Sequence, residues 1–195
     1  MQNNHRAILL ASTLLAVGLL QGCATSIKAS STQNPPPARA FSNYSRIVLK
    51  PVAFAPGYKG SAAGLERINE NLRKNLAGPA DQWNSRASNG TVLTIEPVVE
   101  EMSFKRVAAR VFLGPLVGSS GVLMRVTFRD NTGKVVATPQ FFQRTAAFSG
   151  GFTLGVQDNL MMMRVANLAS DYIVANYDKP VGGPTGADEQ AVKEQ

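Results

Sequence analysis

The stretch from Gly121 to Asp130 alternates apolar and polar side chains, and this pattern most restricts what the 195-residue chain can fold into. Its apolar positions are Val122, Met124, Val126 and Phe128, and its polar positions are Arg125, Thr127 and Arg129. Because successive side chains of a strand point to opposite faces, the alternation predicts a β-strand with one face against a core. The sequence DNTGK at 130–134 predicts a tight turn that uses Gly133, and 134–148 is expected to return as the partner strand. A sheet with one apolar face needs a second layer to cover it.

Two segments have the spacing of helices that cover such a face. Residues 60–78 are expected to form one helix, with Ser61 as its N-cap and Gly78-Pro79 as its end. Its apolar face consists of Leu65, Ile68, Leu72 and Leu76. Residues 156–177 predict a second helix with a wider apolar stripe. That stripe consists of Met161, Met162, Val165, Leu168, Ala169, Tyr172 and Ile173.

Two further strands are expected at 46–54 and 91–104. Pro51 and Pro97 lie within them, and proline cannot donate to a sheet ladder. Pro51 therefore predicts an edge position or a bend, and Pro97 predicts an edge position or a bulge. The predicted order is strand, helix, strand, hairpin, helix. We therefore expect an α+β fold, a two-layer sandwich of a small antiparallel or mixed sheet with two helices packed on one face.

The N-terminus has the features of an export signal. Arg6 precedes 14 uncharged residues, 7–20, and this run is shorter than the roughly 20 residues that a membrane-spanning helix needs. The sequence Leu20-Gln21-Gly22-Cys23 follows, and it contains the only cysteine of the chain. These four residues resemble the lipobox of bacterial lipoproteins. The alternative from the residues alone is a retained anchor helix, with Cys23 an ordinary thiol or a partner in a disulfide between chains.

The lipobox resemblance implies a modification and a location. Diacylglycerol would be attached to the sulfur of Cys23, the signal would be cut between Gly22 and Cys23, and the new amine would receive a further acyl chain such as palmitate. An aspartate after the cysteine commonly retains such proteins at the inner membrane, and Ala24 stands there instead. The resemblance therefore implies a membrane partner, the bacterial outer membrane on its periplasmic side.

The composition along the chain divides it into four parts. Residues 1–22 are the lipoprotein signal peptide, and 23–43, with three consecutive prolines at 35–37, are expected to be a flexible tether that lets the domain stand off from the bilayer. Residues 44–180 are expected to form a single α+β domain. Residues 181–195 are expected to be a disordered tail.

The chain that follows the signal peptide lacks the residues of several chemistries. It contains no histidine, and its single cysteine is Cys23, which excludes a Ser-His-Asp triad, a Cys-His pair and a zinc or haem site built on histidine or cysteine. We expect no metal and no cofactor. Its 19 Lys and Arg residues outnumber 13 Asp and Glu residues, but they are scattered and do not alternate with aromatic residues, so no nucleic acid partner is expected. The oligomeric state does not follow from the sequence.

Two clusters invite a catalytic or metal-binding interpretation. Glu96, Glu100 and Glu101 raise the alternative of a glycan hydrolase, which needs two carboxyl groups about 5–9.5 Å apart. Glu100 and Glu101 point to opposite faces of a strand, and the backbones of Glu96 and Glu100 are separated by roughly 13 Å, so the geometry is poor. Residues 161–163 are three consecutive methionines, and they span too wide an arc of a helix to face one copper ion. We expect these methionines to pack in the core and no catalytic residue to be present.

The segment 105–121 is the candidate partner surface. It combines three basic residues with apolar residues that are interrupted by glycine and proline. The residues proposed for contact are Lys105, Arg106, Arg110, Phe112 and Leu116. The segment is either packed against the core or exposed as an apolar and basic lip that suits a partner or a membrane surface.

Residues 45–179 resemble a group of bacterial envelope lipoproteins that carry a domain of unknown function of the 4410 type. The resemblance is carried by the hairpin Asp130–Val135 and by the glycine-rich stretch FSGGFTLG at 148–155. At the level of fold, the layout also resembles small α/β modules of periplasmic assembly factors such as activators of peptidoglycan synthases. The resemblance implies no enzyme activity.

Location and fold class together lead to an expected role. We expect a non-enzymatic binding or accessory module of the cell envelope, with an envelope protein as its partner. The alternatives are a structural or trafficking component that handles lipid or glycan, and a cell-wall hydrolase.

Overall fold

The computed structural model describes residues 27–104, 120–145 and 156–187 of the chain. The elements are, in order, β1 (Gln33–Asn34), η2 (Phe41–Asn43), β2 (Arg46–Leu49), β3 (Ala53–Phe54), α2 (Ala62–Asn84), β4 (Val92–Ser103), β5 (Ser120–Asp130), β6 (Val135–Ala137), β7 (Gln140–Thr145), α4 (Val156–Ala175) and β8 (Gly183–Pro184). Lys50, Pro51 and Val52 separate β2 from β3, and Thr138 and Pro139 separate β6 from β7. Both breaks contain a proline, as expected for a residue that cannot donate to a ladder.

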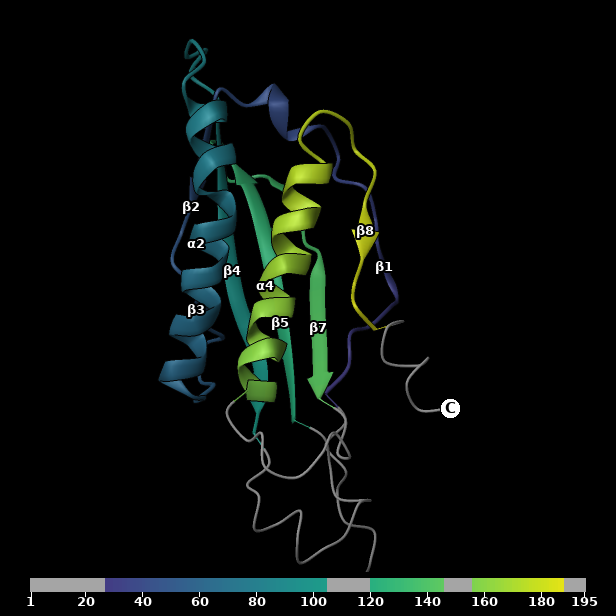
Figure 1. Cartoon of the computed structure of the whole chain (residues 1–195). Coiled ribbons are helices and arrows are strands. Elements are labelled where there is room, and N and C mark those ends of the chain that lie inside the picture. Colours follow the sequence, from purple (N-terminus) through teal and green to yellow (C-terminus); the bar gives the residue numbers. More distant parts are fainter. Residues whose placement is uncertain (1–26, 105–119, 146–155, 188–195) are drawn as a thin grey trace, which may run out of the picture.

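The long strands β4 and β5 form the antiparallel centre of a six-stranded mixed sheet. At one edge, β2 and β3 run parallel to successive parts of β4. At the other edge, β6 and β7 run antiparallel to successive parts of β5. The two helices pack together on one face of this sheet, and β1 and β8 form a small ribbon beside β7 (Figure 1). The two-layer α+β sandwich expected from the sequence is confirmed.

The apolar face of β5 lies at the centre of the core, as the alternation predicted. The four apolar side chains of this strand, Val122, Met124, Val126 and Phe128, are each no more than 1% exposed. The predicted stripes of α2 and α4 cover them, and only Leu65 and Leu168 in those stripes are partly exposed. Phe41, Phe128, Phe141 and Tyr172 form an aromatic cluster, in which Phe41 stacks on Phe128 with 4.6 Å between ring centroids.

Pro97 lies in a central strand, so the edge position that its residue type predicted is wrong. It pairs with Val126 of β5 on one side. The amide of Val126 donates to the carbonyl of Pro139, on the side away from β4. Pro97 and Val126 are therefore a non-hydrogen-bonded pair of the antiparallel ladder, and the nitrogen of Pro97 points away from β5, toward the edge formed by β2 and β3. That edge is interrupted there, because β2 ends opposite Ile95 and β3 begins opposite Val98. No strand residue on that side lies opposite Pro97, so the N–H that proline lacks is not needed for the ladder.

The helix α2 continues to Asn84, so the end predicted at Gly78-Pro79 is also wrong. Its start is as predicted, because the Ser61 side chain accepts a hydrogen bond from the amide of Gly64 at 3.2 Å. Beyond Pro79, Trp83 is 7% exposed and stacks on Tyr177, which follows α4, at 4.4 Å between centroids. The tertiary contacts of this last turn compensate for the hydrogen bond that a proline inside a helix removes.

Residues 27–43, which we expected to belong to a flexible tether, pack against the domain. Phe41 is fully buried in the main core. Ile27 and Ala29 pack with Leu123 and Phe142 on the sheet face opposite the helices. Apolar side chains at these positions give the segment contacts that its proline-rich composition does not reveal.

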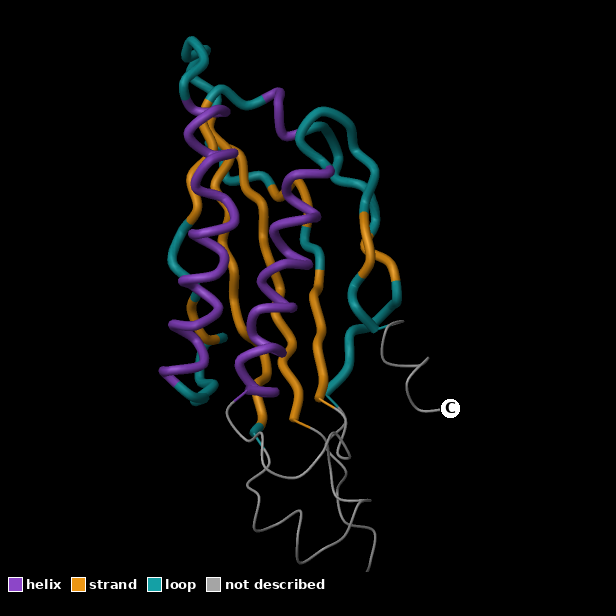
Figure 2. The backbone as a smooth tube through the Cα atoms, viewed as in Figure 1, coloured by secondary structure: helices purple, strands orange, loops and turns teal. Residues whose placement is uncertain are grey.

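The first part of the expected disordered tail is also ordered. Gly183 and Pro184 pair with Asn34 and Gln33 as β8 and β1. Thr185 and Ala187 are buried, and Ala187 joins the small cluster of Ile27 and Ala29. The tube in Figure 2 shows these two terminal segments side by side at the β7 edge of the sheet.

Candidate functional site

The residues that the sequence nominated for lipidation, cleavage and partner contact all lie outside the described residues. They are Gly22, Cys23, Lys105, Arg106, Arg110, Phe112 and Leu116. The structure nevertheless fixes where the chain leaves the described part on the way to each of them. Phe104 and Ser120 flank the segment 105–119, and Ile27 is the first described residue after Cys23.

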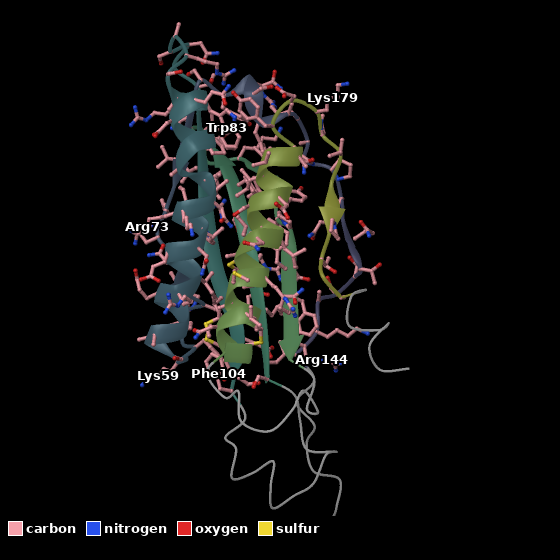
Figure 3. All side chains as sticks on the ribbon, viewed as in Figure 1. Lys59, Arg73, Trp83, Phe104, Arg144 and Lys179 are labelled. Atoms are coloured by element: carbon pink, nitrogen blue, oxygen red, sulfur yellow. The ribbon has the colours of Figure 1, made fainter. Side chains whose placement is uncertain are left out.

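These exit points lie at one end of the sheet, which we name the Phe104 end and define by Ile27, Phe104, Ser120 and Arg144. Ser103 pairs with Gly121, and Gly121 pairs with Arg144, so three strands reach this end in register. A Cβ placed on Gly121 would lie 3.6 Å from the Cβ of Ile27, which places the N-terminal segment beside the same strand. Figure 3 shows Lys59, Phe104 and Arg144 at this end and Lys179 at the opposite one.

The sheet face opposite the helices carries cross-strand ion pairs. Glu96 accepts from Lys50 at 2.7 Å and from Arg129 at 3.0 Å. Glu100 accepts from Arg125 Nε at 2.6 Å. Ion pairs with this exposure contribute roughly 0–1 kcal/mol each to the free energy of unfolding. This face is therefore a solvated surface, and its ion pairs add little to the stability of the fold. The alternation in β5 predicted that Arg125 and Arg129 would lie on this face, away from the core.

The carboxylate of Glu96 is held in its ionised form. The hydrogen bond from Lys50 lowers the pKa of Glu96 below its usual value, and the hydrogen bond from Arg129 lowers this pKa further. Glu100 is engaged by Arg125 and also by Gln140, whose amide lies 3.4 Å from the carboxylate. A general acid of a glycosidase requires a raised pKa. Glu96 and Glu100, two of the three carboxylates that the sequence singled out, therefore have the environment of ion-pair partners.

A shallow groove of about 350 Å³ lies between the first halves of α2 and α4. Its walls are Arg67, Asn71, Asn159, Leu160 and Met163. No local sequence pattern marks it, because its two walls are far apart in the chain. Met163 is 36% exposed here, whereas Met161 and Met162 are buried in the core, so the three methionines do not face one point.

The described ranges lack a membrane-spanning helix and a cluster of metal ligands. No helix within 27–104, 120–145 and 156–187 is both long enough and apolar enough to cross a bilayer. In the same ranges, no group of three His, Cys, Asp or Glu side chains is placed to hold a metal ion.

The sequence matches no protein-family model, and no curated protein matches it. Solved structures with a similar course of the chain include the PelC dodecamer from Paraburkholderia phytofirmans, in a variant and in a second crystal form, with 15% and 16% identity and a TM-score of 0.41 for each. They cover 68% of this chain and 90% and 92% of the PelC chains. A candidate lipoprotein from Caulobacter crescentus CB15 matches with 16% identity and a TM-score of 0.33, over 76% of this chain and 93% of that one. These TM-scores are too low to support an argument about this chain.

Proposed function

We propose that the chain is a lipoprotein of the bacterial cell envelope that is anchored by acyl chains on Cys23 and faces the periplasm from the outer membrane. The observation that carries this proposal is the sequence Leu20-Gln21-Gly22-Cys23 directly after an uncharged run of 14 residues. Two or more acyl chains suffice for stable anchoring, since each buried CH₂ contributes about 0.8 kcal/mol. The first described residue, Ile27, lies four positions after Cys23 and packs against the sheet, which is compatible with an anchor just before the domain.

The proposed role is that of a non-enzymatic binding or accessory module with an envelope protein as partner. The ion-paired states of Glu96 and Glu100 support a binding role over the alternative of a cell-wall hydrolase. Lys105, Arg106, Arg110, Phe112 and Leu116 stay the proposed contact residues. Their segment leaves and re-enters the described structure at Phe104 and Ser120, at the end of the sheet nearest to the proposed anchor.

The anchor is tested by the variant Cys23→Ser in a host that processes lipoproteins. The wild-type chain is expected to sediment with outer membranes, and its intact mass should show loss of residues 1–22 and addition of lipid. The variant lacks the sulfur that accepts diacylglycerol, so it should remain an uncleaved and unacylated precursor. A wild-type chain with an intact and unmodified Met1 terminus would refute the proposal.

The contact residues are tested in the same membranes with the double variant Phe112→Ser, Leu116→Ser. If they form a contact surface, the urea midpoint of unfolding should stay at the wild-type value while co-purification with envelope proteins is lost. A fall in stability of several kcal/mol would instead assign both residues to the core.

A further inference from the structure

We infer that the Phe104 end of the domain rests directly on the bilayer that holds the anchor, with the long axis of the sheet pointing away from the membrane. This inference rests on the proposed lipidation of Cys23. The sequence suggested a flexible tether over 23–43, whereas this orientation requires only the few residues between Cys23 and Ile27 to connect the lipid to the domain.

The chain between the anchor and the domain is too short to act as a spacer. Cys23 and Ile27 are four residues apart, and a fully extended chain spans at most about 3.6 Å per residue, so their separation is at most about 14 Å. The strand β4 has 12 residues, and at about 3.3 Å per residue it is roughly 40 Å long. The opposite end of the sheet therefore lies well beyond the reach of the anchor.

The segment after Ile27 is held to the domain by hydrogen bonds as well as by packing. The Ser30 hydroxyl donates to the side chain of Gln140 at 2.6 Å. The side-chain amide of Asn34 donates to the carbonyl of Gln140 and accepts from its amide, both at 2.8 Å. The hydroxyl of Thr185 donates to the carbonyl of Ser31 at 2.7 Å. Because these bonds begin so close to Ile27, the segment cannot lengthen the attachment without losing them.

The charges at the Phe104 end suit an anionic lipid surface. Lys59 is exposed at this end (Figure 3), and Lys28, which directly follows Ile27, is exposed as well. Basic side chains near an anionic bilayer each contribute about 1 kcal/mol of attraction. On the sheet face opposite the helices, in contrast, the basic side chains of Lys50, Arg125 and Arg129 are engaged in ion pairs with Glu96 and Glu100. An upright orientation on the Phe104 end leaves these ion pairs intact.

The orientation is tested by measuring the distance of each end of the domain from the lipid headgroups. Cys23 is the only cysteine and its sulfur carries the lipid in the proposed state, so an introduced cysteine is the only free thiol. Lys59→Cys and Lys179→Cys are a matched pair, because both side chains are exposed and they lie at opposite ends (Figure 3). The full lipidated chain is labelled with a fluorophore and reconstituted in vesicles of phosphatidylethanolamine and phosphatidylglycerol that contain a headgroup quencher. Quenching at position 59 should exceed quenching at position 179 several-fold.

A linker variant supplies the control. Insertion of 20 Gly and Ser residues after Ala24 adds a flexible spacer with a root-mean-square length of roughly 25 Å. The difference in quenching between positions 59 and 179 should shrink in this variant, because the short attachment imposes the orientation. Equal quenching at both positions in a chain that carries lipid would overturn the orientation alone. Absence of lipid mass, with labelling of Cys23 itself, would overturn the proposed anchor and the orientation with it.

Discussion

Two buried tyrosines show how differently one residue type can be accommodated in this core. Tyr172 is 2% exposed, and its hydroxyl donates to the carbonyl of Pro35 at 3.0 Å. Tyr44 is 3% exposed, and its hydroxyl has no hydrogen-bond partner among the described residues. A comparison of the two residues therefore separates the cost of burying a hydroxyl group from the gain of giving that group a hydrogen-bond partner.

At neutral pH, Tyr172→Phe should reduce the free energy of unfolding by about 1 kcal/mol, because it removes one hydrogen bond and leaves the carbonyl of Pro35 without its donor. The expected effect of Tyr44→Phe is zero or a slight gain in stability, since no bond is lost. Urea unfolding followed by circular dichroism measures both. A larger loss for Tyr44→Phe than for Tyr172→Phe would contradict this account of the two hydroxyls.

Tyr172 should also make the protein sensitive to alkali. Burial raises the pKa of Tyr172 from 10.0 to about 12 in the folded state. Between these two values the unfolded chain loses the proton and the folded chain keeps it, so the stability that is present below pH 10 falls as the pH rises toward 12. A shift of this size corresponds to roughly 2–3 kcal/mol. The Tyr172→Phe variant should lose less stability than the wild type over this range, as measured by urea midpoints at successive pH values; parallel pH profiles would refute the assignment.

Which residues the sequence could identify depends on whether their role is local. The core faces of β5 and α4 follow from periodicity, because burial repeats with the strand or helix repeat. Asn34, Asn69 and Asn84 were missed. Each uses its side-chain amide as a partner for a backbone group of a residue that is distant in the chain, and such a pairing exists only once the elements are assembled.

At the scale of elements, two of these asparagines, Asn34 and Asn84, occupy opposite edges of the sheet. Asn84, at the end of α2, accepts from the amide of Ile47 at 2.7 Å and donates to its carbonyl at 3.0 Å. Asn34 makes the same paired contact with Gln140 of β7. Unpaired strand edges are sites of aggregation, and side-chain amides that engage these backbone groups reduce this risk.

The two glycines of α2 have opposite surroundings and predict opposite effects on stability. A Cβ added to Gly78 would have no neighbour within 4 Å, whereas one added to Gly64 would lie 2.9 Å from the sulfur of Met102 and 3.1 Å from that of Met162. Gly78→Ala should therefore raise the free energy of unfolding by about 0.5–1 kcal/mol, because alanine restricts the unfolded chain and favours the helix. Gly64→Ala should lower it by about 1–3 kcal/mol through overpacking.

Thermal unfolding of both glycine variants beside the wild type measures this contrast. Destabilisation by Gly78→Ala would mean that the chain needs the freedom of glycine before Pro79, and that α2 bends there. The sequence could not decide this point. Gly78-Pro79 is typical of a helix end, and the contacts that extend the helix, made by Trp83 and Asn84, involve residues far along the chain.

At the scale of the whole molecule, the two terminal segments complete the fold that the sequence assigned to residues 44–180 alone. The Pro-rich and Gly-rich stretches have the composition of linkers, but their role here depends on contact between them. Gly182 adopts a φ of 75°, and a Cβ there would lie 2.5 Å from the carbonyl oxygen of Asn34. Glycine thus allows the C-terminal segment to approach the N-terminal one closely enough for β1 and β8 to pair. Composition indicates flexibility in such stretches, and only the assembled structure shows that they pack.

The boundary at residue 44 can be tested by comparing a chain that begins at Ile27 with one that begins at Ser42. The shorter chain lacks Phe41, which is fully buried and stacks on Phe128, and it also lacks the pairing of Asn34 with Gln140. Loss of a buried phenylalanine side chain alone costs about 3–5 kcal/mol. Since domains are stable by only about 5–15 kcal/mol, the chain from Ser42 should be largely unfolded or melt far below the chain from Ile27. Phe41→Ala in the longer chain is the matched control, and it should account for most of the difference in urea midpoint. Equal midpoints for the two chains would show that residues 27–41 contribute nothing to stability and would restore the flexible tether.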